Sequence, residues 1–205
     1  MKNQIIIIHG GDTFDTHKQY LSFLKNKKVD FKRYKTHQKD WKATLGEKLG
    51  KKFEVISPSM PNKQNAKYPE WRIWFKKFIP YFKPKAVLIG HSLGGMFLIK
   101  YLSENKLPQR IRAVFLVSPP YDNKKKKDSL VDFKLPKILN KIDEQIEKIF
   151  IYHSKDDPVV PFSNAKKYLK ILKNSTFRVF SNRGHFNQKS FPELIRDIKS
   201  LVLIL

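Results

Sequence analysis

The chemistry that this sequence could carry centres on a serine between two glycines. Residues 90–94 read Gly-His-Ser-Leu-Gly, which is the G-x-S-x-G pattern, with an apolar run before it and an apolar helical pattern directly after it. In a sharp turn from strand to helix, Gly90 and Gly94 would allow close backbone approach, and Ser92 would face free amides at the helix N-terminus. This context predicts a nucleophilic serine. The alternative is a serine that only caps the helix.

A serine hydroxyl needs a base within hydrogen-bonding reach and a third group that orients the base. The chain order typical of this motif is serine, then a carboxylate, then histidine. His153 and His185 are the two histidines that follow Ser92, and His185 alone follows the last expected strand. We therefore expect His185 to be the general base, with a surface or loop-capping histidine as the alternative. We expect His153 to lie at a strand end, held by local hydrogen bonds.

The carboxylate should follow another strand, between the serine and the histidine. Asp156 and Asp157 come directly after an expected strand, whereas the other acidic residues in that interval lie in expected helices or in a charged segment. Asp157 is preferred because Pro158 restricts the backbone of the residue before it. Asp156 remains the alternative, or a supporting acceptor in the turn.

A metal site at His153, Asp156 and Asp157 is a weaker alternative, because a single loop would supply all three ligands. We expect neither a metal nor a cofactor.

Two backbone amides could hold the oxyanion of the intermediate. One is the N–H of Leu93 at the start of the expected helix, and the other is the N–H of Gly11 in a His-Gly-Gly stretch that follows the first expected strand. The alternative for that stretch is a simple tight turn. Trp71, Tyr121 and Phe186 could line an apolar substrate pocket, although each would also suit a core.

The elements that must position these residues alternate along the chain. Apolar, β-branched runs predict strands at 5–8, 53–56, 86–89, 113–117, 149–152 and 176–180. Helical patterns lie between them, including a pattern around 138–146, one at 163–173 and one at 191–205. Alternation of this kind predicts an α/β fold with a mostly parallel sheet and helices on both faces. The candidate groups all follow strand ends, where such sheets carry their sites.

The length of 205 residues predicts one domain over 1–205, with a basic insertion at 25–50 and a small cap at 119–147. Segment 25–50 interleaves lysines with aromatic residues, which suits either base stacking or a helix with a buried apolar stripe. The chain has no cysteine, and the apolar run near its start is too short for a signal peptide. We expect a cytoplasmic protein with no membrane span.

The formal net charge is +24, from 42 basic and 18 acidic residues. This raises a second hypothesis, a non-catalytic module that binds an acidic protein or a nucleic acid through 25–52 and the four lysines 124–127. However, 35 of the basic residues are lysines spread along the chain, and planar readout of phosphate or guanine favours arginine. We therefore favour a solvated surface and expect no nucleic-acid partner.

With these residues in place, the chain resembles the α/β-hydrolase superfamily, and more narrowly the small serine hydrolases typified by retinoblastoma-binding protein 9 and the bacterial YdeN proteins. The matching stretches are 89–95, 114–118, 154–158 and 184–186. The resemblance implies about six strands, little or no lid, and the second aspartate, Asp157, as the third triad member. The His-Gly-Gly opening and the long basic segment 25–50 depart from the family pattern.

The resemblance also implies esterase-like activity on small substrates. We therefore expect a serine hydrolase that cleaves carboxylic esters, or amides or thioesters, through an acyl-enzyme on Ser92. The acyl specificity and the oligomeric state cannot be predicted from these residues.

Overall fold

One six-stranded sheet organises the protein. The computed structural model describes residues 2–31, 35–36, 39–121, 130–136, 139 and 141–202. The strands lie in the order β2-β1-β3-β4-β5-β6, and every neighbouring pair is parallel. Their bounds are β1 Asn3–Ile8, β2 Phe53–Ile56, β3 Val87–His91, β4 Ile111–Val117, β5 Ile146–Ser154 and β6 Ser175–Phe180. The expected α/β class and parallel sheet are confirmed.

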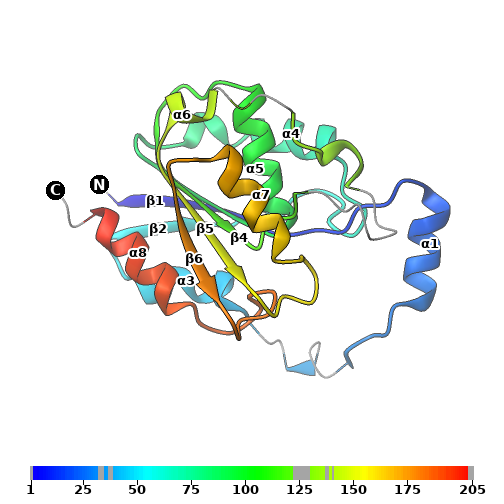
Figure 1. Ribbon diagram of the computed structural model, residues 1–205. Coiled ribbons are helices and arrows are strands. Elements are labelled where there is room, and N and C mark those ends of the chain that lie inside the picture. The colour runs from blue at the N-terminus through cyan, green and yellow to red at the C-terminus, as the bar shows by residue number, and fades with distance from the viewer. Residues whose placement is uncertain are drawn as a thin grey trace.

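Helices cover both faces of this sheet (Figure 1). On one face lie α4 (Tyr68–Lys76), α5 (Leu93–Glu104), α6 (Lys141–Gln145) and α7 (Ser163–Ile171), and on the other lie α3 (Trp41–Leu49) and α8 (Pro192–Val202). Two short 3-10 helices, Ile79–Tyr81 and Val131–Phe133, complete the first layer. Among the described residues, no helix has the length and apolar content needed to cross a bilayer.

The four isoleucines of β1 show why the central strands are apolar throughout. Ile6 and Ile8 point into the core beneath α4 and α5, while Ile5 and Ile7 point into the core beneath α3 and α8. None of them is more than 1% exposed. A strand buried on both faces has no position for a polar side chain, so its sequence does not alternate.

A helix lies within the expected range 138–146, but the strand after it starts earlier than expected. The helix α6 ends at Gln145, and β5 begins at Ile146, three residues before the expected strand start. Ile146 pairs with Ile111 of β4, and the Gln145 side chain accepts a hydrogen bond from the Leu107 amide. Pairing with β4 therefore makes Ile146 and the residues after it a strand, although the helical pattern in the sequence continues to 146.

Segment 25–50 contains the helix α3, whereas the first helix of the chain, at 17–26, lies mostly before this segment. The helix α3 is a core helix, since Trp41, Leu45 and Leu49 are buried against the sheet, and Gly50 ends it with a φ of 89°. The helix α1 (His17–Asn26) instead stands at the edge of the molecule and has no buried residue (Figure 1). The lysines at 124–127 lie outside the described residues, as do the other residues of 122–129 and residues 137–138 and 140 of the expected cap.

Candidate active site

Ser92 lies in a strained turn between β3 and α5. Its φ of 53° and ψ of −125° are rare for a residue with a side chain. A Cβ on Gly90 would lie 2.4 Å from the Cα of Gly95, and a Cβ on Gly94 would lie 2.2 Å from the carbonyl oxygen of Ile8. The motif therefore requires glycine at both positions. The Ser92 side chain makes no capping hydrogen bond to α5, all of whose residues are described, so the capping alternative is not supported.

Ser92 opens onto a cavity of about 120 Å³ at the carboxyl ends of the strands. Gly11 and Leu93, the two expected oxyanion donors, line the same cavity. The rest of the described wall is mostly apolar and consists of Asp12, Thr13, Phe14, Phe23, Pro120, Leu130, Val159, Val160, Pro161 and Asn164. Ser92 and the two residues expected to supply the oxyanion amides therefore line one cavity.

His185 and Asp157 form a hydrogen-bonded pair. The Nδ1 atom of His185 lies 2.9 Å and 3.1 Å from the two carboxylate oxygens of Asp157. The Asp157 side chain is fully buried, and its Oδ1 also accepts from the amides of Val159 and Val160, at 2.8 Å and 2.9 Å. The carboxylate is thus held from both sides and cannot rotate away from the imidazole.

This pairing determines the charge of the carboxylate. Burial acts to raise the pKa of Asp157, but the hydrogen bond and charge of His185, together with hydrogen bonds from neighbours such as the Val160 amide, outweigh burial, so the pKa lies below its usual value. An ionised Asp157 accepts the Nδ1 proton of His185. The other ring nitrogen, Nε2, is then left as the atom that can accept a proton.

Two side chains hold the loop that carries His185. His91 Nε2 donates to the carbonyl oxygen of His185 at 2.8 Å, and the rings of these two histidines are 4.9 Å apart. Trp41 Nε1 donates to the carbonyl oxygen of Phe186 at 2.8 Å. Because His91 directly precedes Ser92, the first contact brings the base loop to the strand end that carries the serine. Sequence reasoning missed both roles.

Asp156 supports the same loop from the other side. Its carboxylate accepts hydrogen bonds from the Ser154 hydroxyl and, at 3.1 Å, from the Gly184 amide. Ser154 Oγ in turn accepts from the Arg183 amide at 3.0 Å. The structure thus places Asp157 on the imidazole and Asp156 on the backbone beside it.

His153 is fully buried in β5, where its Nε2 donates to the carbonyl oxygen of Val160 at 2.9 Å. This local hydrogen bond matches the expectation for a strand-end histidine. Among the described residues, no group of three His, Asp or Glu side chains is arranged to hold a metal ion.

The three aromatic residues expected to line the pocket are not on its described wall. Trp71 and Phe186 are fully buried in the cores on opposite faces of the sheet, and Tyr121 packs edge-on against a tyrosine of α7. The aromatic residues on the wall are instead Phe14 and Phe23. Large apolar side chains near strand ends suit a core equally well, so the sequence could not separate the two groups.

Known proteins resemble this chain in sequence and in fold. The family model described as Serine hydrolase matches residues 33–195. Serine hydrolase RBBP9 of Rattus norvegicus is 26% identical over 150 residues, which is 73% of this chain and 78% of that protein. Among solved structures, the ydeN gene product of B. subtilis superposes with a TM-score of 0.73 at 21% identity, covering 98% of this chain and 99% of that one.

A second solved structure, Est1E from Butyrivibrio proteoclasticus, has a TM-score of 0.60 at 16% identity and covers 98% of this chain and 87% of that one. At these identities the two structural matches establish a shared fold, the α/β-hydrolase fold. They carry no information about the substrate.

Proposed function

This chain belongs to the serine hydrolase family, and from that premise we propose that it cleaves carboxylic esters of small substrates through an acyl-enzyme on Ser92. The observation that supports the proposal is the His185–Asp157 pair, in which Nδ1 of the histidine lies 2.9 Å from a carboxylate oxygen. A hydrogen bond from His91 holds the loop of His185 beside the turn that carries the serine. A base oriented by a buried carboxylate is what a serine needs to become a nucleophile.

The proposed reaction has two stages, acylation and deacylation of Ser92. The Ser92 oxygen attacks the carbonyl carbon of the ester while its proton moves to Nε2 of His185. The amides of Leu93 and Gly11 donate hydrogen bonds to the resulting oxyanion. When the intermediate collapses, the carbon–oxygen bond to the alcohol breaks, and the alcohol leaves with the proton from His185. Water then attacks the acyl-enzyme with His185 as the base, which releases the acid and restores Ser92.

The cavity supports a small substrate. Its volume is about 120 Å³ and its wall is mostly apolar. An apolar cavity of about 150 Å³ holds a molecule of benzene, so this one suits a short acyl chain. We propose esters rather than amides as the main substrates because an alcohol leaves the intermediate more readily than an amine does.

The test is hydrolysis of p-nitrophenyl esters of increasing acyl length by the wild type and by Ser92→Ala. We expect kcat/KM to be highest for the short acyl chains, and we expect Ser92→Ala to lower kcat by about 10⁴-fold or more. Ser200→Ala, on the outer face of α8, is the matched control and should keep the wild-type rate. Full activity in Ser92→Ala would overturn the proposal.

A further inference from the structure

The cavity wall contains a carboxylate on a fixed backbone. Asp12 is the one acidic residue among the described residues of the wall, and it directly follows the proposed oxyanion donor Gly11. The Asp12 amide donates to the carbonyl oxygen of Lys63 and its carbonyl oxygen accepts from Ala66, both at 2.8 Å. Its side chain is 50% exposed. A substrate bound at Ser92 therefore meets a negative charge on the cavity wall.

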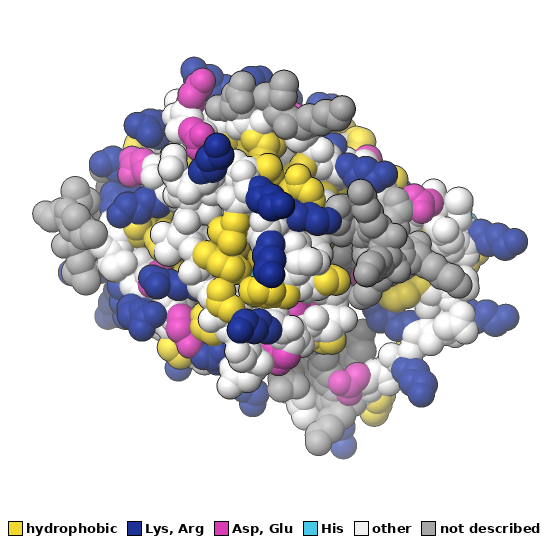
Figure 2. All heavy atoms as spheres, in the orientation of Figure 1, with side chains coloured by type: hydrophobic (Ala, Val, Ile, Leu, Met, Phe, Trp, Pro, Cys, Tyr) yellow, Lys and Arg dark blue, Asp and Glu magenta, His cyan; other side chains and the backbone are white. Residues whose placement is uncertain are grey.

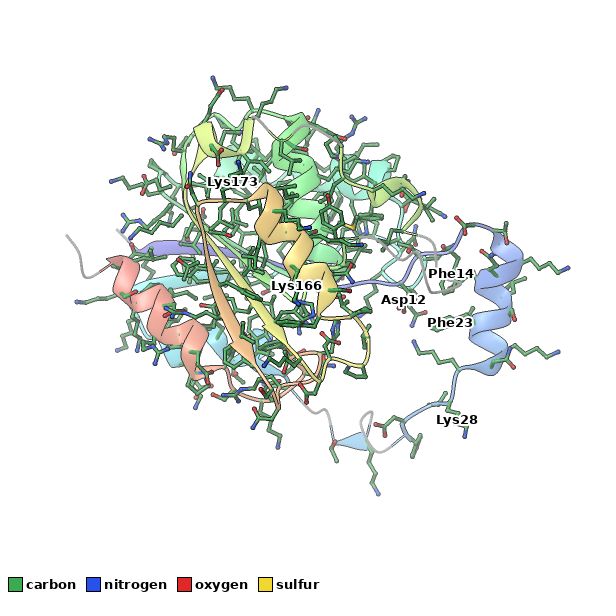
Figure 3. The ribbon with its side chains drawn as sticks, viewed as in Figure 1. Asp12, Phe14, Phe23, Lys28, Lys166 and Lys173 are labelled. Atoms are coloured by element: carbon green, nitrogen blue, oxygen red, sulfur yellow. The ribbon has the colours of Figure 1, made fainter. Side chains whose placement is uncertain are left out.

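An aromatic ring lies on the same part of the wall. Phe23 comes from α1, and its ring centroid is 5.0 Å from that of Phe14, which is buried on the loop after β1. Figure 3 shows Asp12 and Phe14 on this loop with Phe23 on the facing helix. The carboxylate and the aromatic ring thus come from two segments that meet at the cavity.

An ammonium group already lies between these two side chains. The Nζ atom of Lys27 is 3.9 Å from a carboxylate oxygen of Asp12 and 4.5 Å from the centroid of the Phe23 ring. A carboxylate together with the face of an aromatic ring is a combination that binds alkylammonium groups. The contact shows that this corner can hold a cation.

We propose that Asp12 and Phe23 form a subsite for a positively charged ammonium group on the ester substrate, and that Lys27 occupies this subsite until the substrate replaces it. The inference rests on the proposed function and adds a substrate class to it. Ion pairs between half-exposed side chains are weak, so a substrate cation that is also held by the cavity can displace Lys27.

The competing explanation is that Lys27 only fastens α1 to the rest of the protein. This explanation has weight because α1 has no buried residue of its own. The two explanations differ in what Lys27 does to a cationic substrate. A competing lysine weakens its binding, whereas a fastening lysine affects cationic and neutral substrates alike.

The experiment compares pairs of esters that differ only in charge. One pair is acetylcholine and its neutral isostere, in which a tert-butyl group replaces the trimethylammonium group. The other pair carries the same two groups at the end of the acyl chain of a p-nitrophenyl ester. Quaternary groups are chosen because they cannot attack their own ester. The readout is the ratio of kcat/KM for the cationic ester to that for the neutral ester, which cancels differences in the amount of folded enzyme.

In the wild type we expect a ratio above one for at least one pair. Asp12→Asn should lower that ratio about 5- to 10-fold, because the carboxylate is lost while the shape is kept. Lys27→Met should raise it about 2- to 5-fold, because the competing ammonium is gone. The matched controls are Asp15→Asn and Lys28→Met, two exposed residues outside the described wall, and both should leave the ratio unchanged.

A ratio that Asp12→Asn and Lys27→Met leave unchanged would overturn the inference and favour the fastening role. If the wild type cleaves the neutral esters without any preference for the cationic ones, the inference fails while the proposed function stands. If it cleaves neither member of either pair but does cleave short p-nitrophenyl esters, the inference fails and the proposed function stands; if it cleaves none of these esters, both fail.

Discussion

His91 and His153 are buried beside the candidate site, and neither has a part in the proposed proton transfer. Burial is the main cause that lowers the pKa of both, and His91 is the more strongly affected. Both side chains are therefore neutral at pH 7, and each uses Nε2 to donate to a backbone carbonyl oxygen. Their protonation would leave a charge in the core.

This burial predicts a pH-dependent stability. A histidine whose pKa is lowered in the folded state binds a proton more readily when unfolded, so stability present above about pH 6.5 is lost as the pH falls. Below that pH, each such histidine should reduce the free energy of unfolding by up to about 1.4 kcal/mol per pH unit. Urea unfolding of the wild type at pH 7 and pH 5 measures the loss.

His153→Gln separates one contribution, because glutamine can still donate to Val160 but does not titrate. The variant should lose less stability than the wild type between pH 7 and pH 5. The exposed His17→Gln on α1 is the control. An identical pH dependence in His153→Gln and the wild type would contradict the prediction.

At the scale of residues, the sequence predicts the candidate catalytic residues better than the residues that hold them in position. The order of Ser92, Asp157 and His185 and their places after strand ends follow from one motif and an alternating pattern. The contact between His91 and the His185 backbone joins residues 94 positions apart. The acceptor is a backbone carbonyl oxygen, which every residue has, so no residue type in the sequence indicates this hydrogen bond.

At the scale of elements, the turn from β3 to α5 depends on how closely the backbone of β1 approaches it. A Cβ on Gly94 would lie 2.2 Å from the carbonyl oxygen of Ile8. This oxygen belongs to the backbone of β1, so it cannot move aside as the end of a flexible side chain could. Gly46 in α3 offers the contrast, since a Cβ there would meet the side chain of Val55 at an ordinary 3.5 Å.

Gly94→Ala should therefore destabilise the protein by about 3 kcal/mol or more, through overlap with the backbone of β1. Gly46→Ala should be neutral or stabilise by about 0.5–1 kcal/mol, because alanine favours the helix. Chemical denaturation of the two variants compares them directly. Equal stabilities would mean that the close approach at Gly94 is absent.

The helix α3 fixes the loop that carries the proposed base. The Trp41 amide donates to Gln188 at 3.0 Å, and Thr44 Oγ1 donates to Lys189 at 3.1 Å. The Trp41 indole N–H adds the hydrogen bond to Phe186. The basic segment 25–50 therefore contributes, through its C-terminal part, to the position of His185.

Trp41→Phe removes the indole N–H and keeps an aromatic ring in its place. We expect kcat for a short p-nitrophenyl ester to fall by about 10-fold with a smaller change in KM, because the base loop loses one support. Trp74→Phe, on the exposed side of α4, is the matched control and should keep the wild-type kcat. A rise in KM at unchanged kcat would argue against a positioning role for Trp41.

The limits of sequence prediction for elements have the same physical origin. The strands of the sheet could be predicted because burial on both faces makes them apolar throughout. The start of β5 at Ile146 could not be predicted, because the position of the partner strand β4 determines where pairing begins. The aromatic wall of the cavity could not either, since the position of α1 is decided by tertiary contacts such as that between Phe14 and Phe23.

At the scale of the whole molecule, the dominant feature is a net charge of +24. Figure 2 shows Lys and Arg side chains distributed over the visible face, with few Asp and Glu side chains among them. Repulsion among like charges on a compact surface lowers the stability of the folded state.

Screening by salt should relieve this repulsion. Raising NaCl from about 20 mM to about 300 mM shortens the Debye length, so we expect Tm to rise by about 3–6 °C at pH 7. Calorimetry at the two salt concentrations measures the shift, and the same comparison with an uncharged osmolyte in place of NaCl serves as the control. A Tm that falls with added NaCl would show that favourable ion pairs outweigh the repulsion.

The central claim is that His185, oriented by Asp157, activates Ser92. The most direct measurement is the rate of covalent labelling by a fluorophosphonate in the wild type and in His185→Gln, with the labelled residue located by peptide mass spectrometry. We predict a single adduct on Ser92 in the wild type and a labelling rate at least about 100-fold lower in His185→Gln. An adduct on another residue, or an equal rate in the two proteins, would contradict the claim.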